Sequence, residues 1–184
     1  MRRLEAAIGS IVFLAMPGLM GGAVPLALTG WRSSKPAWWL HVSGALLIAT
    51  GVAVLLEAFA RFVIEGRGTP APVAPTERLV IGGLYRHVRN PMYLAVIAAI
   101  IGQALLLGRP GLLVYAAVFW LTVAAFVYGY EEPSLSERYG EQYAAYRRAV
   151  PNWCPRLHPY KDLEAPGTSL PSSHGEPAAR HERD

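Results

Sequence analysis

Two groups of polar and aromatic residues flank an apolar stretch in the second half of the chain, and together their side chains could bind a small charged molecule. The first group falls within Gly82–Tyr93 and the second begins at Glu131. Guanidinium and carboxylate groups together suit a zwitterionic ligand, and tyrosine ring faces attract cations such as a sulfonium. The candidates are Arg86, His87, Arg89, Asn90, Glu131 and Glu132, with Tyr85, Tyr93, Tyr128 and Tyr130 nearby.

Each of these residue types also has an ordinary role in a membrane protein. Arginines before a span set its orientation, tyrosines gather at the bilayer interface, and acids after a span can simply be solvated. Here the two groups stand at both ends of one apolar hairpin. If the hairpin crosses the bilayer and returns, both groups lie at the same membrane face, which favours a shared pocket.

The composition favours a small polytopic membrane protein of one domain. The chain has 184 residues, of which 53% are hydrophobic and 16% charged, and its mean hydropathy is +0.27. Soluble domains are roughly 25% charged. The single cysteine, Cys154, excludes an internal disulfide and is interpreted as a small space-filling residue. The sequence predicts no metal site and no nucleic-acid partner.

Four apolar segments could cross a bilayer, whose hydrocarbon core needs about 20 helical residues. They cover residues 4–28, 38–64, 91–107 and 112–130. The first could instead be a cleaved signal peptide, because two arginines precede its apolar core. The predicted fold class is an all-α integral membrane protein with four transmembrane helices.

The third and fourth spans are predicted to form a tight helical hairpin. Pro91 suits the first turn of a helix, where its missing N–H would have no partner in any case. Residues 108–111 read Gly-Arg-Pro-Gly, which is a strong turn signal. Small residues are expected to let these two helices approach closely. They are Ala98, Ala99, Gly102 and Ala104.

An ionisable pair is predicted within the second span. Glu57 and Arg61 stand four residues apart with the acid first, which is the favourable order for an ion pair on a helix. Ionisable residues within a span are functional candidates. The alternative is that the pair lies near the cytoplasmic end of the helix and reaches the interface.

A charged amphipathic helix is predicted over residues 133–148, on the cytoplasmic side. Leu135, Tyr139, Tyr143 and Tyr146 recur there at helical spacing. From Pro155 onward the chain is rich in proline, serine, glycine and charge. Residues 1–154 are therefore expected to form the membrane domain and residues 155–184 a flexible cytoplasmic tail.

The basic residues predict the orientation of the spans. Of 17 lysines and arginines, three fall on one side of the predicted membrane, namely Arg32, Lys35 and Arg109. The other 14 fall on the opposite side. The positive-inside rule then places both termini and the central loop in the cytoplasm. The expected location is the cell membrane, with membrane lipids as neighbours.

Residues 82–153 carry two motifs at a fixed separation. The first reads Gly-Leu-Tyr-Arg-His-Val-Arg-Asn-Pro-Met-Tyr from Gly83 to Tyr93. The second begins Glu131-Glu132-Pro133-x-Leu135 and continues with Tyr139-Gly140-x-x-Tyr143-x-x-Tyr146 and Val150-Pro151. In these motifs the chain resembles the membrane methyltransferases of the isoprenylcysteine carboxyl methyltransferase and phospholipid methyltransferase group.

The resemblance implies a helical membrane enzyme that binds S-adenosylmethionine at its cytoplasmic face and methylates a small lipophilic or lipid-like acceptor. In that family an arginine-histidine-proline-x-tyrosine motif and paired glutamates line the cofactor pocket. The matching positions here are Arg89, Pro91, Tyr93, Glu131 and Glu132. The set of cofactor-binding candidates is completed by Tyr85, His87 and Asn90. No catalytic residue is assigned.

The chain departs from the family pattern in two places. Asn90 stands where many members have histidine, and asparagine does not titrate near neutral pH. Residues 125–130 carry no charge, whereas the eukaryotic prenylcysteine enzymes have basic residues just before their paired glutamates. This second departure argues against a prenylcysteine carboxylate as the acceptor.

At least one of the paired glutamates is expected to face the pocket, with Glu132 slightly favoured. Neighbouring helical residues point about 100° apart, so both acids can face one pocket only if the backbone breaks. Pro133 disfavours helical geometry at the residue before it and predicts such a break. Two other functional classes remain open, a membrane reductase-like enzyme on a related scaffold and a non-catalytic membrane assembly protein.

Overall fold

The computed structural model describes residues 15–65 and 79–160, and its secondary structure is helical throughout, as predicted. Residues 15–29 form one helical segment that contains the π-helix η1 and the short helix α2. The elements are η1 (Leu19–Ala23), α2 (Val24–Thr29), α3 (Trp38–Glu65), the 3₁₀-helix η2 (Gly83–Arg86), α4 (Pro91–Leu107), α5 (Gly111–Phe126), the π-helix η3 (Val127–Glu131) and α6 (Glu132–Ala149).

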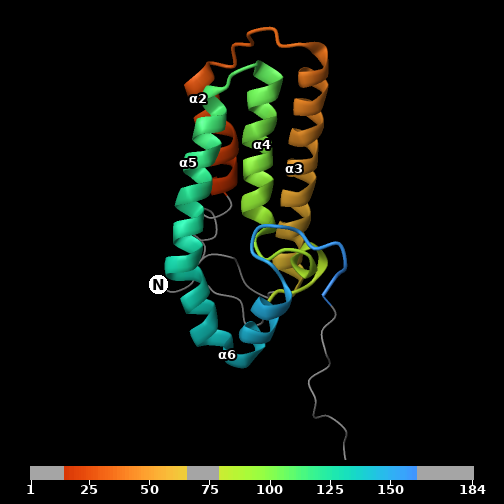
Figure 1. Cartoon of the computed structure of the whole chain (residues 1–184), viewed down its shortest axis with the longest axis vertical. Coiled ribbons are helices and arrows are strands. Elements are labelled where there is room, and N and C mark those ends of the chain that lie inside the picture. Colours follow the sequence, from red (N-terminus) through yellow and green to blue (C-terminus); the bar gives the residue numbers. More distant parts are fainter. Residues whose placement is uncertain (1–14, 66–78, 161–184) are drawn as a thin grey trace, which may run out of the picture.

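The helices stand side by side, with α4 packed against α3, α5 and η1 (Figure 1). The loop from α2 to α3 and the turn from α4 to α5 lie at one end of the bundle. The segment before α4, helix α6 and the chain after α6 lie at the other end. The two predicted clusters, which flank the α4–α5 hairpin, therefore meet at one end of the bundle.

The helix limits follow the predicted signals closely. Helix α4 covers the predicted third span, beginning at Pro91 and ending before Gly108, which takes the left-handed conformation with φ of 63°. Helix α3 extends the predicted second span by one residue, to Glu65. The early part of the first predicted span, on which the signal-peptide alternative rests, lies outside the described residues. The same holds for residues 161–184 of the predicted tail.

Two of the described helices are long and apolar enough to cross a membrane, Trp38–Arg61 and the continuous helix Gly111–Ala149. The apolar helices Ala15–Thr29 and Pro91–Leu107 are shorter. Large apolar side chains are exposed along the outer faces of α3 and α5, which is what lipid-facing surfaces require. They include Val42, Leu46, Val52 and Leu56 on α3, and Val114, Val118 and Leu121 on α5.

The closest helix contact is between α3 and α4, and the prediction that the small residues of α4 serve the hairpin is wrong for Gly102. A Cβ at Gly102 would lie 2.7 Å from Ile48 Cγ1 of α3. A Cβ at Gly44 would lie 2.5 Å from Gly102 O, and one at Gly51 would lie 2.7 Å from Ala95 O. The backbones of α3 and α4 therefore touch at glycines, as small residues permit in membrane helices.

The side chain of Ala98 and the backbone nitrogen of Ala99 also lie beside Gly51 of α3. Ala104 alone of the predicted set packs toward α5, in a cluster with Leu112 and Ala116. The hairpin itself is present, but it is packed through larger side chains than expected.

Gly44→Ala is expected to destabilise the bundle by about 1–3 kcal/mol, the usual cost of overpacking a tight core. An alanine in a helix interior normally stabilises relative to glycine by about 1 kcal/mol, so the sign of the change is diagnostic. Thermal unfolding of the purified protein in detergent measures it.

Gly111→Ala is the matched control, because a Cβ there meets nothing within 4 Å. An unfolding temperature for Gly44→Ala at or above that of Gly111→Ala would show that α3 and α4 are not in backbone contact.

No backbone break occurs at the paired glutamates, so that prediction is wrong. Glu131 and Glu132 both have right-handed helical angles. Instead, α5 passes into α6 through η3, in which the N–H of Glu132 bonds to the carbonyl of Val127, five residues earlier. The wider turn lets the helix continue past Pro133, which would otherwise interrupt the ladder of hydrogen bonds. The kink comes later, at Gly140, with φ of 50°.

Two polar side chains attach the first helical segment to the hairpin. Gln103 Nε2 donates to the carbonyl of Gly21 at 2.6 Å, and the Tyr115 hydroxyl donates to the carbonyl of Met20 at 2.9 Å. Both carbonyls lie in η1, where the π-helical turn leaves them able to accept a second partner. The segment 15–29 is thus held by named hydrogen bonds as well as by packing.

Candidate functional site

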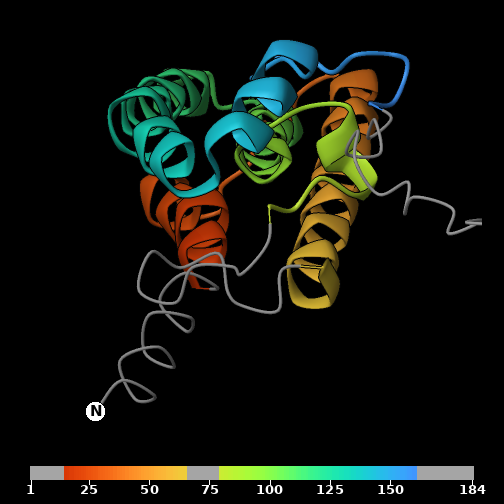
Figure 2. The ribbon, with the colours of Figure 1, turned by 90° about the horizontal axis from the view of Figure 1, so that it is seen from below.

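The chain after α6 folds back along the segment before α4. Residues 150–160, here called the C-terminal strap, make three backbone hydrogen bonds to residues 86–89. Arg89 N–H donates to Pro151 O at 3.0 Å, Arg156 N–H to His87 O at 3.0 Å, and Tyr160 N–H to Arg86 O at 2.9 Å. Seen from this end, α6 crosses the start of α4, and the strap passes beside the segment before α4 (Figure 2). Residues 155–160, which were expected in the flexible tail, are therefore attached to this end of the bundle.

A buried ion pair joins the two predicted clusters. Arg89 Nη1 donates to Glu132 Oε1 at 2.8 Å, and the exposed fractions of the two side chains are 11% and 6%. The same nitrogen also donates to the Tyr143 hydroxyl at 3.2 Å. Arg147 Nε lies 3.5 Å from Glu132 Oε2. Glu132 is therefore surrounded by cations and donors, which compensates its burial.

Two asparagine side chains extend this network. Asn152, on the strap, donates through Nδ2 to Glu132 Oε1 at 3.0 Å. Asn90 donates through Nδ2 to Asn152 Oδ1 at 2.8 Å. Both residues are buried. The side chain of Asn90 does not cap α4, although Asn90 stands at its N-terminus; it is directed to the strap instead.

The other acid of the pair, Glu131, has far less compensation. Its Oε2 accepts one long hydrogen bond, 3.3 Å from the hydroxyl of Tyr93. Burial raises the pKa of Glu131. The hydrogen bond from Tyr93 lowers this pKa, and the charge of Glu132 raises it. A half-buried carboxylate with so little compensation gains more from an added cation than one that is already paired.

The predicted ion pair of α3 is confirmed and lies at the same end of the bundle. Arg61 Nε donates to Glu57 Oε1 at 3.0 Å. Gly83, with φ of 56°, sits directly on this pair, and a Cβ there would collide with Glu57 Oε1 and lie 2.7 Å from Arg61 Nε. The pair therefore supports the η2 turn that carries the chain into the site.

Several candidates are placed away from the network. His87 Nδ1 lies 2.8 Å from the carbonyl of Arg156, so its ring is engaged with the strap. Tyr85 is buried beside Ala58 and Met92, and its carbonyl accepts a hydrogen bond from the Tyr146 hydroxyl at 2.7 Å. The predicted nearby aromatics Tyr128 and Tyr130 are exposed.

The strap is also tied to α5 by aromatic contacts. Trp153 donates through Nε1 to the Tyr128 hydroxyl at 3.1 Å and meets Trp120 edge to face at 6.2 Å. Cys154 beside it is exposed, so its interpretation as a space-filling residue is wrong. The strap is thus fastened both to the segment before α4 and to the end of the hairpin.

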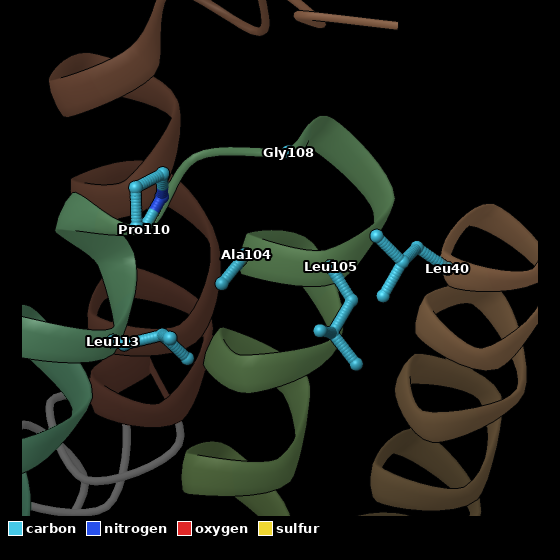
Figure 3. Close-up of a pocket in the computed structure, with 6 residues that line it drawn as sticks. All are labelled: Leu40, Ala104, Leu105, Gly108, Pro110 and Leu113. Atoms are coloured by element: carbon cyan, nitrogen blue, oxygen red, sulfur yellow. The ribbon is translucent and has the colours of Figure 1, made fainter. Parts of the chain in front are cut away.

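A separate apolar pocket of about 230 Å³ lies at the opposite end of the bundle (Figure 3). Its lining comes from α3, α4, α5 and the hairpin turn, and consists of Leu40, Ala104, Leu105, Gly108, Pro110 and Leu113. None of these side chains can titrate, donate or attack, so this pocket offers no chemistry. The polar network at the other end remains the candidate site.

The sequence analysis identified the residues of the network before α4 and at the start of α6, but it missed Asn152, which joins Asn90 to Glu132. Arg89, Asn90 and Glu132 were candidates, and Tyr143 belonged to the second motif. Asn152 was not singled out, because an asparagine after a proline reads as a turn residue. No local sequence pattern indicates that the side chain of Asn152 contacts Asn90.

Comparison with known proteins identifies the class. The profile of the phospholipid methyltransferase family matches residues 39–142, more than half of the chain, and the chain belongs to this family. Members of this family of membrane proteins are S-adenosylmethionine-dependent methyltransferases. The matched region runs from α3 into α6 and includes Arg89 and both glutamates.

The similar proteins of known name are protein-S-isoprenylcysteine O-methyltransferases. The chain is 29% identical to the protein-S-isoprenylcysteine O-methyltransferase of Mus musculus over 132 residues, 68% of this chain and 44% of the mouse protein. It is 27% identical to protein-S-isoprenylcysteine O-methyltransferase B of Arabidopsis thaliana over 126 residues, 66% of this chain and 62% of the plant protein. The alignments thus cover about half of each relative's length. No solved structure matches the chain significantly.

Proposed function

We propose that this protein transfers a methyl group from S-adenosylmethionine to a lipophilic or lipid-like acceptor at the cytoplasmic face of the cell membrane. The observation that carries the proposal is the buried Arg89–Glu132 pair, with the poorly compensated Glu131 beside it, at the end of an apolar hairpin. Family membership supplies the reaction class, and the geometry supplies the groups that would hold the cofactor.

The polar groups fit the charges of the cofactor, which are a carboxylate, an ammonium and a sulfonium. Arg89 Nε is buried and has no acceptor among the described residues, so this N–H is available for the carboxylate. Glu131 has one long hydrogen bond and is available for a cation. Glu132 is already satisfied, and we assign it the role of holding Arg89 rather than contacting the cofactor.

When bound, the sulfonium supplies an activated methyl group that needs no protein nucleophile. The chain's own contribution is then to bind and orient. Placing nucleophile and methyl carbon about 3–3.5 Å apart and in line provides the main acceleration. The acceptor would enter from the bilayer along the exposed apolar faces of the helices. The uncharged stretch of residues 125–130 favours an acceptor without a carboxylate.

The test is cofactor binding followed by product analysis. The purified full chain should bind S-adenosylmethionine in calorimetry. Incubated with a membrane lipid extract and isotope-labelled cofactor, it should place label in a lipid product identified by mass spectrometry. Absence of cofactor binding by folded protein would exclude the methyltransferase proposal and leave the reductase-like and assembly classes.

We further propose that four helices span the membrane, with both termini in the cytoplasm. Ser33, in the loop before α3, and Cys154, on the strap, are both exposed and lie at opposite ends of the bundle. In intact cells a membrane-impermeant thiol reagent should leave Cys154 unlabelled. It should label Ser33→Cys in a Cys154→Ala background.

Permeabilised cells provide the control, since both cysteines should react there. Equal labelling of the two positions in intact cells would overturn the four-span topology.

A further inference from the structure

The amide groups of Asn90 and Asn152 have one possible direction of hydrogen bonding. An ionised carboxylate accepts hydrogen bonds and donates none, so Asn152 must present its Nδ2 to Glu132. Its Oδ1 is then left to accept from Asn90 Nδ2. The three residues form a directed chain from the start of α4, through the strap, to the start of α6.

This chain ends on the oxygen of Glu132 that also accepts from Arg89. Glu132 Oε1 receives Arg89 Nη1 at 2.8 Å and Asn152 Nδ2 at 3.0 Å. The two donors fix the carboxylate from two sides. The carboxylate in turn fixes the guanidinium, whose Nε is the donor left without an acceptor.

We propose that Asn90 and Asn152 form a neutral amide relay that positions Glu132 and, through it, Arg89 for the cofactor. The inference rests on the proposed function and makes Asn152 a positioning residue of that site. It also explains what a non-titrating side chain does at position 90. Asn90 supports a hydrogen-bond chain that keeps its direction whatever the pH, because neither amide gains or loses a proton near neutrality.

Asn152→Asp tests the relay with almost no change in shape. The new carboxylate would still accept from Asn90, but its second oxygen would face Glu132 Oε1. Two carboxylates at this distance cannot both be ionised without strong repulsion, so the pair takes up a shared proton at a raised pKa. Arg89 and Arg147 contact Glu132 and not position 152, so the proton would reside mainly on the new acid at that position.

The expected signature is a pH dependence specific to this variant. An acid with a raised pKa in the folded state destabilises that state at high pH. The destabilisation begins to shrink as pH falls through the folded-state pKa and is gone below the unfolded-state pKa, about 3.9 for an aspartate. Without ligand, Asn152→Asp should therefore unfold at a lower temperature than wild type at pH 8, and the difference should shrink toward pH 5. Comparing wild type with the variant at each pH cancels the contributions of ionisable groups that both proteins share, such as Glu131 beside Glu132 and His87 at the strap.

The decisive readout is the dissociation constant for S-adenosylmethionine, measured by calorimetry on the full chain over the same pH range. Asn152→Ala should bind about 10-fold more weakly than wild type, the lower end of the effect of a hydrogen bond to a charged group. For Asn152→Asp the ratio of dissociation constants should be largest at pH 8 and approach one toward pH 5. Asn90→Ala combined with Asn152→Ala should be little worse than Asn152→Ala alone, because the relay acts as a unit.

Gln142→Ala, an exposed polar change on α6, is the matched control and should bind as wild type does. A pH-dependent unfolding temperature with a dissociation constant equal to that of wild type would overturn the positioning role. Unfolding and binding that are both independent of pH in Asn152→Asp would overturn the relay itself. Failure of wild type to bind the cofactor while Asn152→Asp still shows the pH-dependent unfolding would refute the proposed function and not the hydrogen-bond chain.

Discussion

Arg89→Ala is expected to lower the free energy of unfolding by about 3 kcal/mol and to weaken the binding of S-adenosylmethionine by about one to two orders of magnitude. The substitution leaves the carboxylate of Glu132, whose exposed fraction is 6%, without its strongest partner. Removing one member of a buried ion pair costs about 3–5 kcal/mol, because the remaining charge stays desolvated. The interaction with Arg147 at 3.5 Å compensates only in part, since half of that side chain is exposed.

The ligand effect has a separate cause, the loss of the donor for the cofactor's carboxylate. A charge-assisted hydrogen bond contributes about 1.5–3 kcal/mol, which corresponds to a 10- to 150-fold weaker affinity. Arg89→Lys should recover part of the stability and less of the binding, because an ammonium group cannot reproduce the planar fork of donors.

Arg86→Ala is the control for both measurements. Arg86 belongs to the same basic cluster, but its side chain makes no hydrogen bond or ion pair with the described residues. Chemical denaturation and calorimetry of the three variants in one detergent give the comparison. If Arg89→Ala behaves as Arg86→Ala does, Arg89 is an orientation signal and the network is not a cofactor site.

The two glutamates should give opposite results when each is changed to glutamine. Glu131→Gln removes a half-buried, under-compensated charge and keeps an acceptor for Tyr93, so stability without ligand should be unchanged or higher at neutral pH. Binding of the cationic cofactor should weaken about 100-fold. Because ligand stabilisation scales as RT ln(1 + [L]/Kd), the loss corresponds to about 2.7 kcal/mol at saturating ligand.

Glu132→Gln should instead destabilise the protein without ligand. The new amide group would confront donors from Arg89, Asn152 or Arg147 where a carboxylate oxygen now accepts. A buried donor left without an acceptor costs about 1–3 kcal/mol. Thermal unfolding with and without S-adenosylmethionine separates the two patterns.

The pH dependence of wild-type binding provides an independent check on Glu131. A carboxylate binds a cation only when ionised, and burial raises the pKa of this one. Affinity should therefore decrease as pH falls, beginning above the usual range of a glutamate, and this decrease should be missing in Glu131→Gln. Full ligand stabilisation in both glutamine variants would place the cofactor away from the acidic pair.

The sequence predicts the helices well because their ends carry strong local signals. Pro91 and Gly108 mark the limits of α4, and the apolar stretches are long enough to leave no alternative to helices in a bilayer. Helix packing was predicted less well. Gly102 could allow close packing against either α3 or α5. The glycines of α3, Gly44 and Gly51, show that the close contact is with α3.

In the candidate site, too, the residues in local motifs were predicted and the long-range contacts were not. Arg89 and Glu132 belong to recognisable motifs, so their placement in one site could be anticipated, whereas the ion pair between them was not predicted. Asn152 and the strap depend on a return of the chain that no short-range pattern encodes. The predicted break at Pro133 was wrong because a π-helical turn supplied a second way to pass a proline. Asn90 was recognised as a departure from its family, but its partner lies 62 residues away.

The route of the strap has a consequence for the order of events during biosynthesis. Arg89 and Asn90 leave the ribosome before the whole hairpin, Glu132 follows 43 residues after Arg89, and Asn152 comes 62 residues after Asn90. Arg89 has no carboxylate partner until Glu132 is synthesised, and Asn90 has no amide partner until Asn152 follows. In the proposed four-span topology, the hairpin would therefore be inserted while its flanking polar groups are still solvated. Closure of the network is the last step, and it is available only to chains that have been translated beyond residue 152.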